Sequence, residues 1–192
     1  MIPNGQHWTR TMRAGTGDDA SAITRAIYEM AGGAPMLDLG CGAANQTKNL
    51  QGTWVDIEPR IEGEVDGEVV KQNLMDFLLN NPIRVNLIIL GDVIEHLSRT
   101  DGEILLDVIA DRNTIIFTPI GKLWMNKVIG NSPHEHKSGW YPEEFFNAGW
   151  TVWEWPTWHR LEDGSFAGAF WTWSLPRTVE DVSHQSGVEV NS

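Results

Sequence analysis

The sequence has little of what marks secreted or membrane-spanning proteins. It contains one cysteine, Cys41, so no disulfide can form within the chain, which fits a reducing compartment. The longest apolar run, near residues 85–90, is much too short to cross a bilayer, and residues 1–16 have no apolar core of the signal-peptide kind. We therefore expect a cytoplasmic protein.

Basic residues are also scarce. The chain has 14 Lys and Arg residues against 26 Asp and Glu residues, which gives a formal net charge of -12. Affinity for nucleic acid and for anionic membranes depends largely on Lys and Arg, so this balance argues against both partners. The sequence has no internal repeat, and its 192 residues are enough for one domain with a substantial core.

A glycine turn is the feature around which the rest of the chain is organised. Residues 36–45 begin as a buried strand and end in the turn that contains Gly40 and Gly42. Because glycine has no side chain, the backbone can turn sharply there and a ligand can approach the main chain closely. A strand, a glycine-rich turn and a helix form the first corner of many nucleotide-binding α/β sheets.

The apolar periodicity predicts strands that alternate with helices. We expect strands at residues 36–39, 53–57, 69–72, 85–90 and 114–118, and helices at residues 18–30, 45–50, 74–79 and 98–110. This alternation indicates a parallel sheet with helices on both faces. Ligands bind at the carboxyl ends of such strands. The residues just beyond those ends should therefore face one crevice: Gly40, Asp56, Asn73, Gly91 and Pro119.

The pattern changes after Pro119. Residues 120–138 form a long connection, followed by an expected helix at 142–148 and strands at 151–155 and 167–174. Trp153 and Trp155, like Trp171 and Trp173, alternate along a strand, so we expect each pair in the core or at a subunit interface. Residues 176–192 are polar and acidic and are expected to form a disordered tail.

Three segments together resemble the class I S-adenosylmethionine-dependent methyltransferases. Residues 37–42 (LDLGCG) resemble the first motif of that family, Asp56 resembles its second acidic position, and residues 91–97 (GDVIEHL) resemble the segment after its fourth strand. Residues 131–142 are similar to a small-molecule branch of the family. The resemblance extends over residues 34–155, and the combination of motifs is far more specific than any one of them.

The resemblance implies a fold, a cofactor and a set of binding residues. The fold is a Rossmann-like seven-stranded, mostly parallel sheet with helices on both faces and an antiparallel last strand. A single domain at residues 1–175 would comprise an N-terminal helical cap (1–33), a cofactor-binding core (34–118) and a substrate loop with the C-terminal strands (119–175). The residues expected to contact S-adenosylmethionine are Asp38, Gly40, Cys41, Gly42, Asp56, Ile57, Asn73, Leu74, Gly91 and Asp92.

The acceptor side is less determined by these motifs. The expected acceptor is a small molecule, with His96 and His136 as candidate catalytic residues and Trp124, His134 and Trp140 as candidate substrate contacts. Glu95 and His96 fit either an acid–base pair or packing residues at the start of a helix. We expect no metal site, because two histidines two residues apart lack an evident third ligand.

Two other functions are compatible with parts of the sequence. An NAD site would need a third glycine or alanine three residues after Gly42, but Asn45 stands there. A non-catalytic S-adenosylmethionine-binding module that acts through a protein partner fits the high tryptophan content.

Cys41 fits either a nucleophile or, more simply, a small residue that fills the turn. The sequence does not indicate an oligomeric state.

Overall fold

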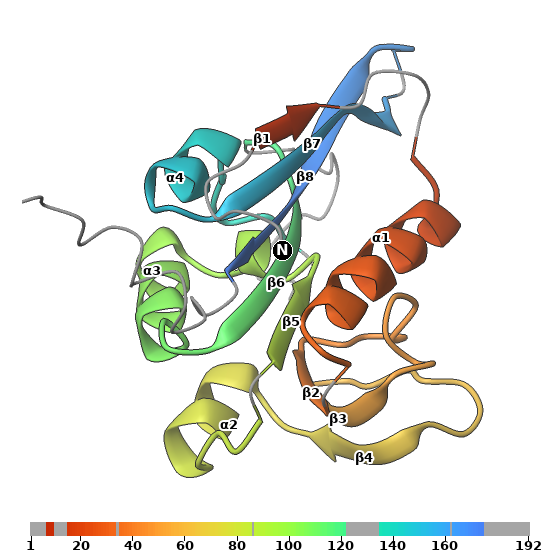
Figure 1. Cartoon of the computed structure of the whole chain (residues 1–192), viewed down its shortest axis with the longest axis vertical. Helices are drawn as coiled ribbons and strands as arrows, with labels where there is room; N and C mark the ends of the chain where they lie inside the picture. Colours follow the sequence, from red (N-terminus) through yellow and green to blue (C-terminus); the bar gives the residue numbers. More distant parts are fainter. Residues whose placement is uncertain are drawn as a thin grey trace, which may run out of the picture.

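The computed structural model describes residues 7–9, 15–33, 35–85, 87–121, 135–161 and 163–174. An eight-stranded sheet with the order β1-β7-β8-β6-β5-β2-β3-β4 forms its centre (Figure 1). The strands are β1 (His7–Thr9), β2 (Met36–Leu39), β3 (Gln51–Asp56), β4 (Asp66–Lys71), β5 (Leu87–Gly91), β6 (Asn113–Pro119), β7 (Thr151–Arg160) and β8 (Phe166–Ser174). The helices are α1 (Gly17–Met30), α2 (Leu74–Asn80), α3 (Arg99–Val108) and α4 (Pro142–Asn147), with one 3-10 turn, η1 (Ile94–His96).

The topology confirms the Rossmann-like sheet. Strands β2 to β6 pair in parallel, whereas β8 is antiparallel to both β6 and β7. The last strand in the sequence is therefore the antiparallel one, as expected. The order changes direction at β2, which has β3 on one side and β5 on the other. In open α/β sheets, ligands bind in the crevice at such a switch point.

An additional edge strand was not predicted. β1 has 3 residues and pairs in parallel with β7, with Trp8 opposite Trp153. A segment this short has no measurable periodicity, and its partner lies near the other end of the chain. Only the fold could therefore identify β1 as the outermost strand.

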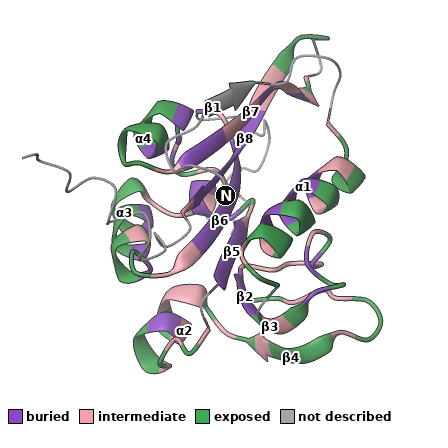
Figure 2. Cartoon of the chain, viewed as in Figure 1, coloured by how far each residue is buried: buried purple, intermediate pink, exposed green. Residues whose placement is uncertain are grey.

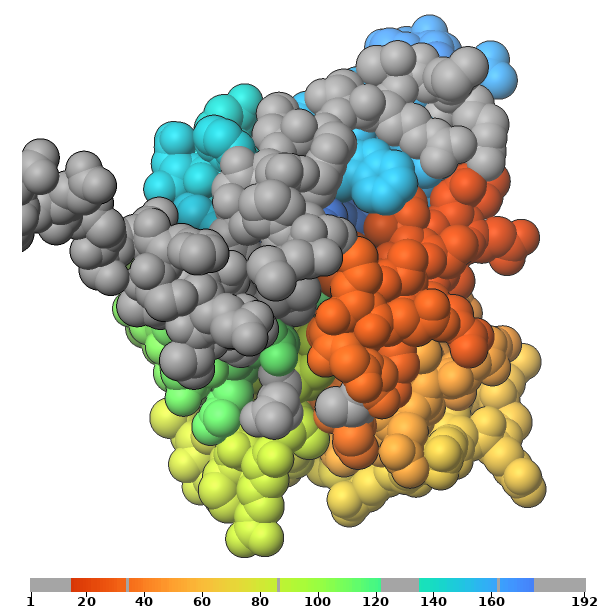
Figure 3. Space-filling view, viewed as in Figure 1, coloured from red at the N-terminus to blue at the C-terminus, as the bar shows by residue number. Residues whose placement is uncertain are grey.

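Helices cover both faces of the sheet, as predicted. Figure 1 shows α1 on one side and α2, α3 and α4 on the other. Ile23 and Ile27 of α1 belong to one buried cluster, and Leu105 of α3 and Phe145 of α4 belong to a second cluster across the sheet. Burial is concentrated in the central strands and in the inner sides of these helices, whereas the edge strand β4 is mostly exposed (Figure 2). In the space-filling view α1 lies between the β3–β4 end and the β7–β8 end of the molecule (Figure 3).

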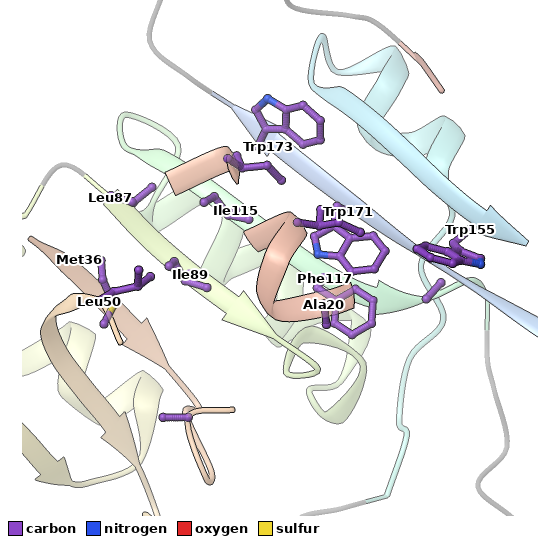
Figure 4. Close-up of a cluster of buried hydrophobic side chains, with 14 of the residues drawn as sticks. Ala20, Met36, Leu50, Leu87, Ile89, Ile115, Phe117, Trp155, Trp171 and Trp173 are labelled. Carbon is purple, nitrogen blue, oxygen red and sulfur yellow. The ribbon is translucent and has the colours of Figure 1, made fainter. Parts of the chain in front are cut away.

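Tryptophans of the last two strands lie in the core beside α1. Trp171 stacks on Phe117 of β6, with ring centroids 4.3 Å apart (Figure 4). Trp155 and Trp173 are also buried, whereas Trp153 is partly buried against the same cluster. The expectation of core positions is therefore confirmed for the three buried tryptophans. Large aromatic side chains contribute much of the buried apolar area of a core.

The expected helix at residues 45–50 is wrong. The described structure has successive turns there, and Ala44 has a φ of 53°. The side chain of Thr47 bonds the Asp38 carboxylate, and the Asn45 carbonyl accepts a hydrogen bond from Ser21 of α1. Such contacts compete with helix formation in a segment rich in Asn, Gln and Thr.

Among the described residues, no helix combines the length and apolarity needed to span a bilayer.

Candidate active site

A cavity of about 370 Å³ lies at the carboxyl ends of the central strands. Every residue that the sequence predicts as a cofactor contact lines it, and so does His96. Four of the five residues predicted to follow strand ends are among these: Gly40, Asp56, Asn73 and Gly91. Pro119, the last residue of β6, is not among the described lining residues, so this part of the prediction is wrong. The predicted crevice is therefore formed by the loops after β2, β3, β4 and β5.

The glycine turn adopts a backbone conformation that favours glycine. Gly40 has a φ of 79°, and a Cβ atom there would lie 2.6 Å from Cγ2 of Val93. Gly42 has a φ of 51° with open space where its Cβ would be. Gly40 N donates to the Val55 carbonyl over 2.7 Å, which ties the turn to the end of β3. Both glycines line the cavity, and because neither has a side chain, their main-chain atoms form part of its wall.

Asp56 joins this turn to the next strand. Its Oδ2 accepts from Gly42 N over 2.8 Å, and its Oδ1 accepts from Glu58 N over 2.6 Å. Each carboxylate oxygen has two lone pairs, so both oxygens retain acceptor capacity toward a ligand. The carboxylate is thus held at the cavity wall by two main-chain donors.

Asp38 lies deeper, under the turn. It is buried, and its Oδ2 accepts from the Thr47 hydroxyl, which in turn accepts from Trp54 Nε1 over 3.0 Å. Burial raises the pKa of Asp38 to about 7, the Thr47 hydrogen bond opposes that rise, and the charge of Asp56 adds to it. A cationic ligand group in the cavity would favour the ionised carboxylate.

Helix α1 holds the segment after the turn in place. Ser21 Oγ donates to the Asn45 carbonyl over 2.8 Å, and Thr24 Oγ1 donates to Gln46 Oε1 over 2.8 Å. A Cβ atom on Gly91 would lie 3.1 Å from Nε2 of Gln46, so Gln46 bridges from α1 toward the end of β5. The wall of the cavity thus depends on a helix that precedes the glycine motif.

Two further predicted residues have defined structural roles at the rim. Asn73 caps α2, because its Oδ1 accepts from Met75 N over 2.9 Å and from Asp76 N over 3.3 Å. Its amide Nδ2 is then the group that can donate to a ligand. Asp92 has a φ of 55°, uncommon for a residue with a side chain, and its N–H donates to the Phe117 carbonyl over 2.8 Å.

The structure favours the packing role for Cys41. Burial and the charges of Asp38 and Asp56 raise the pKa of its thiol to about 12. The thiolate is the nucleophilic form, so this environment suppresses its reactivity at neutral pH.

The predicted acceptor-side residues fall in different places. His96 lines the cavity, and His136 lies against its ring, edge to face, with centroids 4.8 Å apart. Trp140 is instead buried in the second core cluster, where its Nε1 donates to Ser138 Oγ over 2.8 Å. Trp124 and His134 lie outside the described residues.

The cavity also has lining residues that the sequence did not single out. They are Ala43, Ala44, Asn45, Gln46, Thr47, Glu58, Arg60, Ile89, Val93, Leu97 and Lys137. Glu58 and Arg60 follow Asp56 in one loop, so proximity in sequence was a usable signal. Thr47 was assigned to a helix, and Lys137 reaches the cavity only because its segment packs on η1.

Similar structures have been solved, although no family model and no curated protein matches the sequence. A SAM-dependent methyltransferase from Archaeoglobus fulgidus is 18% identical, with a TM-score of 0.57 over 83% of this chain and 95% of that chain. The N-methyltransferase NodS from Bradyrhizobium japonicum is 11% identical, with a TM-score of 0.54 over 83% of this chain and 96% of that one. The chain has the fold of the class I S-adenosylmethionine-dependent methyltransferases.

A third structure with the methyltransferase fold holds ligands. The 1,6-didemethyltoxoflavin-N1-methyltransferase from Burkholderia thailandensis, with bound 1,6-didemethyltoxoflavin and S-adenosylhomocysteine, is 15% identical. Its TM-score is 0.52 over 82% of this chain and 79% of that chain. At these identities the similarity shows the fold alone.

Proposed function

We propose that the protein is an S-adenosylmethionine-dependent methyltransferase that acts on a small molecule. The observation that carries this proposal is the chemistry of the cavity at the switch point. The glycine turn exposes main chain to it, and Asp38, Asp56 and Asp92 supply carboxylates around it. S-adenosylmethionine carries an ammonium, a sulfonium and a ribose diol, which suit carboxylate acceptors.

Each wall of the cavity would contact one part of the cofactor. Gly40 and Gly42 would face the methionine and ribose parts, with Asp38 below them as an acceptor for the ammonium or its water shell. Asp56 would accept hydrogen bonds from the ribose hydroxyls. Asn73 and Leu74 would lie beside the adenine, and Gly91 and Asp92 near the sulfonium.

The same features disfavour a dinucleotide. In the NAD fingerprint the pyrophosphate lies at the N-terminus of the helix that follows the glycine turn. Here the residues after the turn do not form that helix, and the carboxylates that line the cavity outnumber its two basic side chains, Arg60 and Lys137. Anionic phosphates would be repelled by these carboxylates, whereas a cationic cofactor would be attracted.

The acceptor would approach from the side of His96. When bound, the cofactor supplies an electrophilic methyl group to a nucleophilic atom of the acceptor in an in-line displacement. His96 lines the cavity and His136 supports its ring, so we propose these residues as the ones that orient the acceptor and promote loss of its proton. The net charge of -12 favours a small molecule over nucleic acid as acceptor.

Calorimetric titration with S-adenosylhomocysteine tests the cofactor assignment, with NAD as the control ligand. We expect micromolar binding of S-adenosylhomocysteine and no heat from NAD. Binding of NAD alone, or of neither ligand, would contradict the proposal. Formation of S-adenosylhomocysteine from S-adenosylmethionine with a pool of small-molecule acceptors then distinguishes an enzyme from a module that only binds the cofactor.

A further inference from the structure

Three potential metal ligands meet beside the cavity. Glu95, His96 and His136 each offer one ligand atom, and these atoms all lie within 4.8 Å of one another. Glu95 and His96 belong to η1, whereas His136 comes from the segment before α4. Two imidazoles and one carboxylate form a ligand set typical of catalytic zinc and of other first-row divalent ions.

Backbone hydrogen bonds hold the two segments together. The carbonyl of Glu95 accepts from Lys137 N over 2.8 Å and from Ser138 N over 3.1 Å. The carbonyl of Ile94 accepts from Ser138 Oγ over 3.1 Å and from Trp140 Nε1 over 3.2 Å. His136 is therefore brought to η1 by main-chain pairing next to it and by a buried tryptophan.

The Glu95 carboxylate is buried and incompletely paired. Glu95 is 1% exposed, and its Oε2 accepts from Thr118 Oγ1 over 2.9 Å. Its Oε1 is buried and has no hydrogen-bond partner among the described residues. A buried polar atom without a partner costs free energy, and a bound cation would supply the missing partner.

His96 has the outer contact that metal-binding histidines usually make. Its Nδ1 lies 3.2 Å from the backbone carbonyl of Glu135. A carbonyl only accepts, so this contact places the ring proton on Nδ1 and makes Nε2 the atom with the lone pair. Thr118 in turn orients Glu95, because its hydroxyl donates a hydrogen bond to one oxygen of the Glu95 carboxylate. Such contacts orient the ligands of a metal site.

We propose that Glu95, His96 and His136 bind one divalent first-row transition-metal ion at the edge of the cavity. Zinc and similar ions lie about 2.0–2.2 Å from their ligands, so two ligands of one ion are at most about 4.4 Å apart. In tetrahedral geometry the ligand atoms would lie about 3.3–3.6 Å apart, so each side chain would move inward by roughly 1 Å or less to close the cluster around the ion. Mg²⁺ is a poorer match, because it prefers oxygen ligands.

The site would narrow the choice of acceptor, a step that rests on the proposed function. Three protein ligands leave a coordination position open, and His96 lines the cavity. An acceptor hydroxyl bound there would lose its proton to water more readily. Its oxygen would form the new C–O bond as the S–CH₃ bond breaks, with the electron pair of that bond remaining on sulfur. The acceptor would then carry an oxygen nucleophile.

Calorimetric titration of metal-free protein with Zn²⁺ and with Mn²⁺ tests the site. We expect one ion per chain for at least one of these metals, and at least tenfold weaker binding in Glu95→Gln and in His136→Asn. His159→Asn is the matched control, because His159 lies in β7 and pairs in register with Ala167, outside the cluster. Far-UV circular dichroism checks that each variant is folded. If the buried substitution Glu95→Gln prevents folding, His136→Asn still tests the site.

Nonspecific binding to an acidic protein is the main competing outcome. The net charge of -12 can attract cations to the surface, but that binding would have no fixed stoichiometry and would not depend on His136. Equal affinity in wild type and His136→Asn, or no binding at all, would overturn the metal site. Titration of the same proteins with S-adenosylhomocysteine in the presence of a chelator tests the cofactor site separately from the metal site. The predicted cofactor contacts do not include this cluster, so we expect S-adenosylhomocysteine to bind even when the metal is removed.

Discussion

Asp56 has two structural bonds at the cavity wall, to Gly42 N and to Glu58 N. It therefore positions the glycine turn as well as offering acceptors to a ligand. The sequence predicted only the contact with the ligand, because Asp56 resembles the second acidic position of the methyltransferase motifs, and the bonds to the turn appeared only in the structure. A substitution there should change ligand affinity and local order together.

We predict that Asp56→Ala weakens binding of S-adenosylhomocysteine by about 1–3 kcal/mol, the scale of hydrogen bonds to a charged group. Calorimetric titration measures the loss directly. Glu64→Ala is the control, because Glu64 is an exposed acid in the loop after β3 and does not line the cavity. Unchanged affinity in Asp56→Ala would remove Asp56 from the binding site.

Asp38 should make stability depend on pH. Its pKa is raised from 3.8 to about 7 in the folded protein, so between these values the folded chain keeps a proton that the unfolded chain has released. The stabilising effect of that proton is complete below about pH 4 and is lost as the pH rises through 7.

Asn does not titrate, so Asp38→Asn should not lose this contribution as the pH increases, and it should become more stable relative to wild type. We expect the difference in free energy of unfolding to grow from pH 4 to pH 8 by an amount on the order of a few kcal/mol. Urea denaturation at several pH values measures this difference. A difference that stays constant across the range would show that Asp38 does not titrate in this window.

At the scale of elements, the turn after β2 depends on the packing of the segment after β5. Gly40 and Val93 are far apart in sequence, but a Cβ atom on Gly40 would lie 2.6 Å from Cγ2 of Val93. Gly63 has a similarly positive φ of 86°, with open space around it. Substitutions at these two glycines therefore distinguish the cost of a left-handed backbone from the cost of a steric clash.

We expect Gly63→Ala to cost about 1–2 kcal/mol of folding stability, the penalty of a left-handed backbone. Gly40→Ala should cost that amount and roughly 1–3 kcal/mol more, because the added methyl group would overpack against Val93. Chemical denaturation of both variants provides the comparison. Equal losses would mean that the turn can shift away from Val93 at little cost.

The elements differ in how far local pattern determines them. β5 was predicted because a buried parallel strand is a continuous apolar run, a signal that needs no partner to be recognised. Residues 45–50 were misassigned because Ser21, Thr24 and Asp38 take up their polar groups, and these partners come from other elements. Periodicity cannot report such competition.

At the scale of the whole molecule, β1 covers the edge of β7. Three residues of β1 pair with Val152, Trp153 and Glu154 of β7. Without this strand, the backbone groups of β7 on that side would be exposed, and exposed edges promote association between chains. β1 is therefore expected to protect the edge of the sheet that lies farthest from β4.

Deletion of residues 1–9 should lower stability and increase self-association relative to the full chain. Each lost backbone hydrogen bond contributes about 1 kcal/mol, so we expect a small but measurable decrease in the free energy of unfolding. Size-exclusion chromatography over a range of protein concentrations measures association, and urea denaturation measures stability. If both properties are unchanged, β1 does not contribute to edge protection.

The sequence by itself determined the strands of the sheet other than β1, the glycine turn and the acids at the strand ends. Each of these depends on the pattern of neighbouring residues, and the parallel alternation then brings the strand ends to one edge. Only the tertiary structure decided that Trp140 lies in the core and that Glu95, His96 and His136 form one cluster. Those contacts join η1 to a segment far along the chain through backbone pairing, and local sequence carries no signal for that pairing.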